Sequence, residues 1–211
     1  MRLTLKLTSG PDAPRLFVFA RHAESTANAA GVLNADPAHR MPLTERGETQ
    51  ARQLGAQLAC LRIDVAVATR FLRTQQTAEL ALGGRDVPLM IEPHFDEVRA
   101  GTYDGASVYA YWAWEQQHPT SESLPQGESV DEALLRIANG LRRLLSRTDS
   151  VTLVVLHAFA LHNIASAAGS SRPPGEALFA HAVPYLFDED AVARAAAALE
   201  AIGRGLSPQP G

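Results

Sequence analysis

The sequence predicts an α/β fold of three layers, in which helices cover both faces of a mostly parallel central sheet. Two observations lead to this prediction. Short runs of consecutive apolar residues recur along the chain, which is the pattern of strands buried on both faces. Segments with apolar residues near the helical period of about 3.6 lie between these runs, and such alternation is typical of parallel strands joined by helical crossovers.

Four of the runs are the expected strands of the buried sheet. Each is short, mostly apolar and rich in residues that favour strands. They cover residues 16–20, 64–68, 87–91 and 151–156. A further segment differs from them, because Leu3, Leu5 and Leu7 alternate with polar residues and predict a short, half-buried strand of the kind found at a sheet edge.

Helices are expected between and after these strands. Residues 44–61 place apolar side chains near the helical period. Ser129 and Glu132 have the spacing of a capping box just ahead of another such pattern, which predicts that a helix begins there. The alanine-rich segment 191–202 is expected to be helical, and residues 207–211 are expected to be frayed.

Composition and charge limit the class of protein. With 211 residues, of which 46% are apolar and 20% charged, the chain is expected to form one globular domain over residues 1–211. Its 19 basic and 23 acidic side chains give a net charge of −4, which argues against nucleic acid or a membrane surface as a partner. No run approaches 18 apolar residues and residues 1–11 lack the apolar block of a signal peptide, so a cytoplasmic protein is expected.

Charged residues follow each expected strand. Taken alone, each has an ordinary structural explanation as a hydrogen-bonded histidine or a solvated arginine or glutamate. The residues at the four strand ends are Arg21 and His22, then Thr69, Arg70 and Arg73, then Glu97, and finally His157. Because the carboxyl ends of parallel strands meet at one edge, where open α/β sheets bind ligands, we expect two imidazoles, at least one guanidinium and a carboxylate on one rim.

This combination suits a phosphate group. Guanidinium forks, imidazolium rings and helix N-terminal amides all bind phosphate oxygens. Ser25 is expected to precede a helix whose amides point at the same anion, and Asn28, one turn into that helix, can donate a further hydrogen bond.

Metal and thiol sites are weighed as alternatives. The single cysteine, Cys60, excludes an internal disulfide, and its place at the apolar end of the predicted helix 44–61 predicts a buried packing role. His157 and His162 are five residues apart and do not face one ion as an i, i+4 pair would. No metal and no cofactor are therefore expected. Four histidines show no informative spacing and are expected to be surface or structural residues: His39, His94, His118 and His181.

At this point the chain resembles a known family, the histidine phosphatase superfamily, in its phosphoglycerate mutase-like branch. Residues 21–25 with Asn28 resemble the signature R-H-G-E-[ST]-x-x-N. Further segments resemble its later motifs, in the family's order: residues 43–51, 69–78, 97–105, 127–129 and 156–158. These motifs lie within residues 17–165, and residues 166–211 match no family segment, so the closing strand and the lid are not assigned. The resemblance implies the phosphoglycerate mutase-like form of the three-layer fold.

Three positions depart from the family pattern. Ala23 and Ala158 stand where glycines usually follow the two histidines, and a methyl group at either place is expected to reshape the pocket. Thr69 stands for the usual serine, which is a mild change.

The resemblance implies a catalytic role for five residues. His22 is the nucleophile that takes the phosphoryl group as a phosphohistidine, and it must attack as a neutral imidazole. Arg21, Arg73 and His157 hold the phosphate oxygens and stabilise the transition state, with His157 as an imidazolium beside the bound dianion. Glu97 is the candidate general acid, because a neighbouring dianion raises the pKa of a carboxyl group.

The substrate-binding residues that follow from the same reading are Asn28, Ser25, Ala158 and Tyr103. The aromatic residues between Glu97 and Gly127 have two explanations that the sequence leaves open. They either line an apolar pocket for a ring-bearing leaving group or pack a lid helix onto the core. They are Tyr103, Tyr109, Tyr111, Trp112 and Trp114.

The expected function is that of a metal-independent phosphomonoesterase acting on a small phosphorylated metabolite. A phosphoglycerate mutase-type phosphoryl transfer is the first alternative, and the short interval between Glu97 and Gly127 favours the phosphatase. A non-catalytic phospho-ligand-binding protein of the same fold is the second, although His22 and the other named groups are all present. A two-fold homodimer is the default expectation for an assembly.

Overall fold

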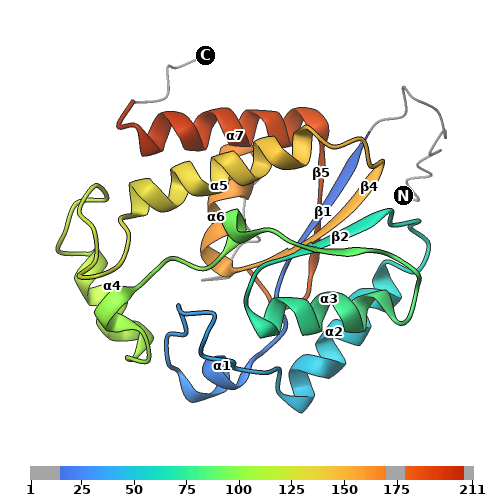
Figure 1. Ribbon diagram of the computed structural model, residues 1–211, viewed down its shortest axis with the longest axis horizontal. Helices are drawn as coiled ribbons and strands as arrows, with labels where there is room; N and C mark the ends of the chain where they lie inside the picture. The colour runs from blue at the N-terminus through green and yellow to red at the C-terminus, as the bar shows by residue number, and fades with distance from the viewer. Residues whose placement is uncertain (1–14, 170–178, 207–211) are drawn as a thin grey trace.

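In the computed structural model, which describes residues 15–169 and 179–206, five strands form one sheet in the order β3-β2-β4-β1-β5 (Figure 1). The first four strands in this order, β3, β2, β4 and β1, are parallel to one another. The last strand, β5, runs antiparallel to β1. The strands are β1 (Leu16–Arg21), β2 (Val65–Ala68), β3 (Leu89–Ile91), β4 (Val151–Leu156) and β5 (Pro184–Asp188). The mostly parallel sheet is confirmed.

Helices cover both faces of this sheet, which confirms the three-layer architecture. One layer holds α2 (Glu45–Gln57) and α3 (Leu72–Leu82). The other holds α5 (Val130–Leu145), α6 (Ala158–Ala167) and α7 (Glu189–Gly203). Two shorter helices, α1 (Thr26–Ala30) and α4 (Val108–Glu115), lie outside the two layers, at the lower left of the sheet in Figure 1. The short turns η1 (Pro93–Phe95) and η2 (Gly101–Tyr103) lead from β3 toward α4.

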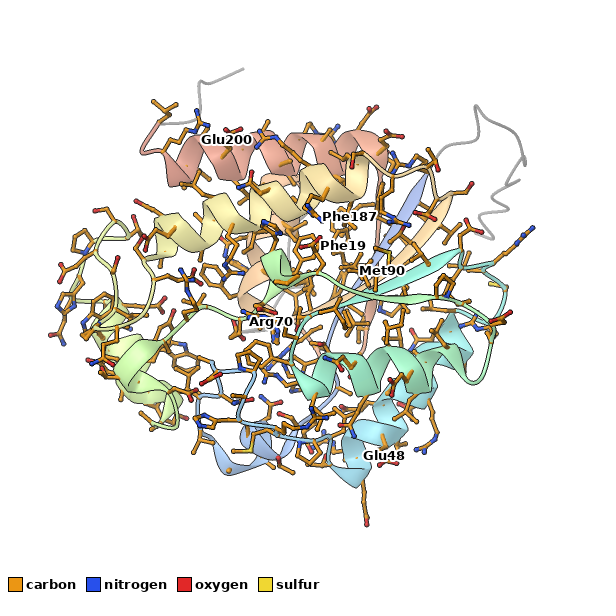
Figure 2. The ribbon with its side chains drawn as sticks, viewed as in Figure 1. Phe19, Glu48, Arg70, Met90, Phe187 and Glu200 are labelled. Carbon is orange, nitrogen blue, oxygen red and sulfur yellow. The ribbon has the colours of Figure 1, made fainter. Side chains whose placement is uncertain are left out.

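Successive side chains of β1 point to opposite faces of the sheet, so they pack alternately against the two helical layers. Phe17 and Phe19 are fully buried on the side of α5, α6 and α7, and Val18 and Ala20 are fully buried on the side of α2 and α3. Figure 2 shows Phe19 beside Phe187, and their ring centroids lie 5.5 Å apart in an edge-to-face contact. This contact ties the edge strand β5 to the same core.

Several expected elements are present with nearly the expected bounds. The capping box at the start of α5 is confirmed, because Oγ of Ser129 accepts from the Glu132 amide at 3.1 Å and the Glu132 carboxylate accepts from the Ser129 amide at 2.8 Å. Residues 191–202 form most of α7 as predicted. Leu3, Leu5 and Leu7, and the segment 207–211, lie outside the described residues.

Two expectations about local structure differ from what is observed. β3 begins at Leu89, not at residue 87, because the amide of Val87 is bonded to the carbonyl of Arg85 in a turn and Pro88 has no amide to donate. The prediction that Cys60 is buried was wrong: α2 ends at Gln57, so Cys60 follows the helix and is exposed.

β5 is an element that the sequence did not predict. It begins with Pro184, a residue that argues against a central strand but is tolerated at a sheet edge. Within the residues that the structure describes, no helix is long and apolar enough to cross a membrane, and no three His, Cys, Asp or Glu side chains lie close enough together to hold a metal ion.

Candidate active site

Residues that follow four strands meet around one cavity. His22 comes after β1, Arg73 lies in the first turn of α3 after β2, Glu97 comes after β3 and His157 after β4. The cavity has a volume of about 330 Å³, and the first three residues line it. His157 is fully buried against Arg73. The structure thus brings together the imidazoles, guanidinium and carboxylate that the sequence predicts on one rim.

The ring of His22 is held in one tautomer by its two contacts. Nδ1 lies 2.8 Å from the carbonyl oxygen of Ala23, which can only accept, so Nδ1 carries the proton. Nε2 lies 3.1 Å from Nε of Arg73, which can only donate, so Nε2 carries the lone pair. Burial, and then the charge of Arg73, hold the pKa of His22 well below its usual value. The ring is therefore neutral, which is the form a nucleophile needs.

Arg73 connects the two histidines at the centre of the site. Besides its contact with His22, it donates from Nη2 to Nδ1 of His157 at 3.0 Å. Its guanidinium also donates to the side-chain oxygen of Asn34 at 2.5 Å and to the Asn34 carbonyl at 3.1 Å, and it lies over the ring of Phe71, 4.4 Å from the centroid. Burial lowers the pKa of Arg73 to about 10, so the group keeps its charge at neutral pH.

His157 is likewise neutral in the ligand-free protein. Its Nδ1 accepts from Arg73, so the proton lies on Nε2, which is 3.0 Å from Oγ1 of Thr69. Burial, and then the Arg73 charge, hold the pKa of His157 well below its usual value. The ring centroids of His157 and His22 are 5.3 Å apart, close enough for both rings to reach one phosphoryl group. That a bound dianion converts His157 to an imidazolium stays a prediction.

Arg21 has a donor that the protein leaves unused. Nη1 donates to the carbonyl of Phe179 at 3.0 Å, whereas Nε is buried and has no hydrogen-bond partner within the described residues. Arg21 lines the cavity. Leaving a buried N–H without an acceptor costs free energy, and a bound anion would supply the acceptor.

Glu97 is the carboxylate nearest to these cations. Its Oε2 lies 3.7 Å from Nδ1 of His157, and its Oε1 accepts from the Val98 amide at 3.2 Å. Burial raises the pKa of Glu97, although the charges of Arg73 and Arg21 act in the opposite direction. A raised pKa favours the protonated form, which is what a general acid requires.

Ser25 and Asn28 line the cavity but also bind each other. Oγ of Ser25 accepts from the Asn28 amide, and Oδ1 of Asn28 accepts from the Ser25 amide at 3.0 Å, which makes a capping box for α1. Because Oδ1 of Asn28 is used in this contact, its side chain can bind a ligand through the NH₂ group, which donates. The Thr26 amide donates to the Pro42 carbonyl, so two of the three first amides of α1 are used within the protein. These two amides are therefore not available to the anion, contrary to the expectation that the amides of α1 bind it.

The start of α6 offers amides instead. His157 is its N-cap and makes no side-chain capping bond, and Ala158, the first residue of the helix, lines the cavity. The methyl group of Ala158 thus lies where the family pattern has a glycine. Ala23, the other such position, is fully buried in the core beneath α2 and α3 and is not a cavity residue. Of the two replaced glycines, Ala158 is the one that shapes the pocket.

Residues of the second recognised motif hold the loop that follows His22. The Thr44 amide donates to the carbonyl of Glu24 at 3.0 Å, and the side chain of Gln50 accepts from the Glu24 amide at 2.9 Å. Gly47 packs so closely on this loop that a Cβ at that position would lie 2.0 Å from the Glu24 carbonyl oxygen. These contacts explain the residue types at these three positions.

A buried carboxylate holds the loop that carries Glu97. Glu128 is 1% exposed, accepts from the Arg99 amide at 3.0 Å and binds the guanidinium of Arg136 at 2.5 Å. Arg136 in turn donates to the backbone carbonyls of the same loop, that of Glu97 included. The motif at residues 127–129 therefore positions Glu97.

Two residues that the sequence singled out lie away from the cavity. Tyr103 is not among the residues that line it, and packs beside Trp114 with ring centroids 6.4 Å apart. Arg70, labelled in Figure 2, pairs with Asp96 at 2.6 Å and is half exposed. Tyr111 and Trp112 do line the cavity. The aromatic segment therefore reaches the cavity through these two rings and not through Tyr103, which was the predicted substrate-binding residue.

Sequence reasoning missed Asn34 and His181. Asn34 is buried and binds Arg73, as described above. Nδ1 of His181 lies 2.7 Å from the carbonyl oxygen of His22, and the two ring centroids are 5.6 Å apart. Burial, and then the charge of Arg21, lower the pKa of His181 to about 4. Neither residue lies in a recognised motif, so no local signal marked them.

Comparison with known proteins gives a consistent result. Residues 17–181 match the family Histidine phosphatase superfamily (branch 1). The chain is 31% identical over 148 residues to the "Adenosylcobalamin/alpha-ribazole phosphatase" of Salmonella typhimurium, a match that covers 64% of this chain and 70% of the relative. It is 30% identical over 149 residues to the "Probable phosphoglycerate mutase GpmB" of Erwinia tasmaniensis, with 67% and 68% covered. The solved structure of the alpha-ribazole phosphatase from Shigella flexneri is similar with a TM-score of 0.69 at 25% identity, over 81% of this chain and 89% of that one.

Proposed function

The chain belongs to the histidine phosphatase superfamily (branch 1), and we propose that it is a metal-independent phosphomonoesterase that acts through a phosphohistidine on a small phosphorylated metabolite. The observation that carries the proposal is the state of His22. Its Nε2 has a lone pair and faces the guanidinium of Arg73, its ring lies beside the imidazole of His157, and it shares the cavity with the carboxyl group of Glu97.

The first step is attack on the bound ester. Phosphate oxygens take over N–H donors of Arg73 and Arg21, which releases the Nε2 lone pair of His22 from its contact with Arg73. A bond forms between Nε2 and phosphorus, and the bond from phosphorus to the ester oxygen breaks. Protonated Glu97 gives its proton to the leaving oxygen, so the alcohol departs neutral.

The second step is hydrolysis of the phosphohistidine. Glu97 is now a carboxylate and accepts a proton from a water molecule as the water oxygen bonds to phosphorus. The bond from phosphorus to Nε2 breaks, and inorganic phosphate and neutral His22 result. Both steps use the same donors, and the two together consume one water per ester.

The rival function is defined by relatives that are named for different activities. One relative is an adenosylcobalamin/alpha-ribazole phosphatase and another is a probable phosphoglycerate mutase, in which the phosphoryl group would return to an oxygen of the organic molecule. The short interval between Glu97 and Gly127, which holds η2 and α4, supports the phosphatase. Alpha-ribazole phosphate is accordingly the first natural ester to assay, with 3-phosphoglycerate beside it. Release of inorganic phosphate from the first, without isomerised product from the second, is the expected result.

Rapid-quench labelling tests the covalent step. Protein mixed with a ³²P-labelled aryl phosphate is expected to carry label that is stable in base and lost in acid, on the peptide that contains His22. His22→Ala is expected to take no label and to lose turnover while its circular dichroism spectrum stays unchanged. Turnover of the aryl phosphate by folded His22→Ala would overturn the proposal, and absence of label and turnover in the parent protein would favour a non-catalytic binding protein.

A further inference from the structure

The cavity that reaches His22 is cationic at one end and apolar over much of its remaining wall. Arg21 and Arg73 lie at the strand ends, next to His22. The wall beyond them comes from the segment after α1, the loop after Glu97, helix α4 and the start of α6. Its apolar residues include Val32, Leu33, Val98, Val108, Trp112 and Phe159.

Helix α4 presents one face to this cavity. The four of its residues that line the cavity are spaced i, i+3, i+4 and i+7, which is a single stripe along a helix: Val108, Tyr111, Trp112 and Glu115. Tyr109, on the other side of the helix, is 73% exposed. The phase of α4 therefore places one carboxylate, that of Glu115, beside the apolar side chains of this wall.

Glu115 has an incomplete set of partners. The hydroxyl of Tyr111 donates to its Oε1 at 2.5 Å. Within residues 15–169 and 179–206, no arginine, lysine or histidine forms an ion pair with Glu115, whereas Glu128 is paired with both Arg99 and Arg136. A tyrosine hydroxyl offers one donor and no charge, so the second carboxylate oxygen retains its acceptor capacity.

We propose, resting on the phosphatase function proposed above, that Glu115 and Tyr111 form the leaving-group end of the cavity and select phosphomonoesters by the charge of the leaving alcohol. The preferred alcohol has an apolar ring, which the α4 stripe and Phe159 contact, and a neutral or cationic hydrogen-bond donor that reaches Glu115. An alcohol that carries a carboxylate is disfavoured, because that group would be brought next to Glu115 within an apolar wall. Esters of phosphoglycerate type fall in the disfavoured class.

Burial supports this assignment of roles. It raises the pKa of Glu115 above its ordinary value, which indicates that the carboxyl group is partly removed from water before a ligand arrives. A hydrogen-bond donor of the ligand would therefore supply the Glu115 carboxylate with a contact that water no longer provides. Tyr111 is 8% exposed and packs with Val98 and Leu124, so it holds Glu115 from a fixed position.

Three synthetic esters test the proposal. They are 4-(hydroxymethyl)phenyl, 4-(aminomethyl)phenyl and 4-(carboxymethyl)phenyl phosphate, in which the methylene group keeps the reactivity of the leaving phenol nearly constant. We expect kcat/KM for the aminomethyl ester to exceed that for the carboxymethyl ester by about tenfold or more, the size of one charge contact in a partly desolvated site. The hydroxymethyl ester is expected to lie near the aminomethyl ester.

Variants of Glu115 identify the group responsible. Glu115→Gln is expected to reduce the aminomethyl to carboxymethyl ratio by about fivefold or more, and Glu115→Lys to invert it. Tyr111→Phe is expected to shift the ratio in the same direction by less. Glu122→Gln, which removes an exposed carboxylate in the loop after α4, is the matched control and is expected to leave the ratio unchanged. A parent ratio near one, or a ratio that Glu115→Gln does not alter, would overturn the proposal.

A binding measurement separates this proposal from the proposed function. The corresponding 4-substituted benzylphosphonates cannot be hydrolysed, and calorimetry gives their affinities for the parent protein and for Glu115→Gln. If the esters are not turned over, the phosphatase function fails, and the ratio of phosphonate affinities still decides the role of Glu115. Equal affinities for the aminomethyl and carboxymethyl phosphonates would contradict that role.

Discussion

Nε of Arg73 lies 3.1 Å from Nε2 of His22, so the nitrogen that we propose as the nucleophile is held by a guanidinium that we propose binds the phosphate. A phosphoryl oxygen that accepts this N–H takes the donor away from Nε2. Substrate binding and release of the nucleophile are then one event. The geometry links affinity for the anion to reactivity at His22.

Arg73→Lys is expected to lower kcat/KM for an aryl phosphate by about 10²-fold or more, because an ammonium keeps the charge but cannot contact His22, His157 and Asn34 at once. Steady-state kinetics measure the effect. Arg70→Lys, on an exposed arginine three residues away, is the control and is expected to change kcat/KM by less than about threefold. Similar losses in both variants would show that Arg73 has no special place in the reaction.

Glu97→Gln is expected to slow esters of poorly acidic alcohols more than esters of acidic phenols, since an acidic phenol needs no proton to leave. The loss for an alkyl phosphate should fall in the range of about 10²–10⁴-fold that general acids contribute. Comparison of kcat for alkyl phosphates and 4-nitrophenyl phosphate in parent and variant measures it. Equal losses with both would remove Glu97 from the acid role.

The pH profile provides a separate check on the same group. Burial raises the pKa of Glu97, so its protonated form is lost as pH rises through that raised value. The pKa of His22 is held low, so this ring stays neutral as pH falls below 6.5. We expect the ratio of kcat/KM between the parent and Glu97→Gln to fall as pH rises, because titration of the substrate cancels in the ratio. A ratio independent of pH would speak against the acid.

His181 is expected to make stability depend on pH. Its pKa is about 4 in the folded chain and about 6.5 when unfolded, so between these values the unfolded state binds a proton that the folded state does not. The free energy of unfolding therefore falls as pH drops through this window. Urea denaturation at several pH values should give a shallower dependence for His181→Asn than for the parent. His39→Asn, on an exposed histidine, is the control, and an unchanged slope in His181→Asn would refute the expectation.

Gly47→Ala is expected to destabilise the protein, because the new Cβ would lie 2.0 Å from the carbonyl oxygen of Glu24. Overpacking costs about 1–3 kcal/mol, which lowers Tm by about 2–12 °C in a chain of this size. Activity should fall too, since the displaced loop follows His22. Differential scanning calorimetry measures the shift, with Gln53→Ala on the exposed side of α2 as the control. An unchanged Tm would mean that the loop accommodates the methyl group.

The sequence predicted the elements whose signals are local. Buried strands, the capping box at Ser129 and the strand-end positions of His22 and His157 depend on short stretches of chain, and the structure has them in place. The roles of these side chains in a reaction stay predictions. Cys60 was misplaced because α2 ends at Gln57, before the apolar pattern of residues 44–61 does.

Features that depend on distant segments were not predictable in this way. Asn34 reaches Arg73 across 39 positions and His181 reaches His22 across 159, and neither contact leaves a periodic trace in the sequence. The aromatic segment shows the same limit on a smaller scale. Its composition was visible, whereas the rotation of α4 that turns Tyr111 into the cavity and Tyr109 outward required the fold.

The two alanines that follow the histidines carry identical side chains into different surroundings. Removing the methyl group of Ala23 would leave a small void between close-packed layers and destabilise the folded protein. Removing the methyl group of Ala158 would enlarge the cavity in which a ligand binds. A single carbon atom at Ala23 thus affects the stability of the protein, and a single carbon atom at Ala158 affects which ligands fit.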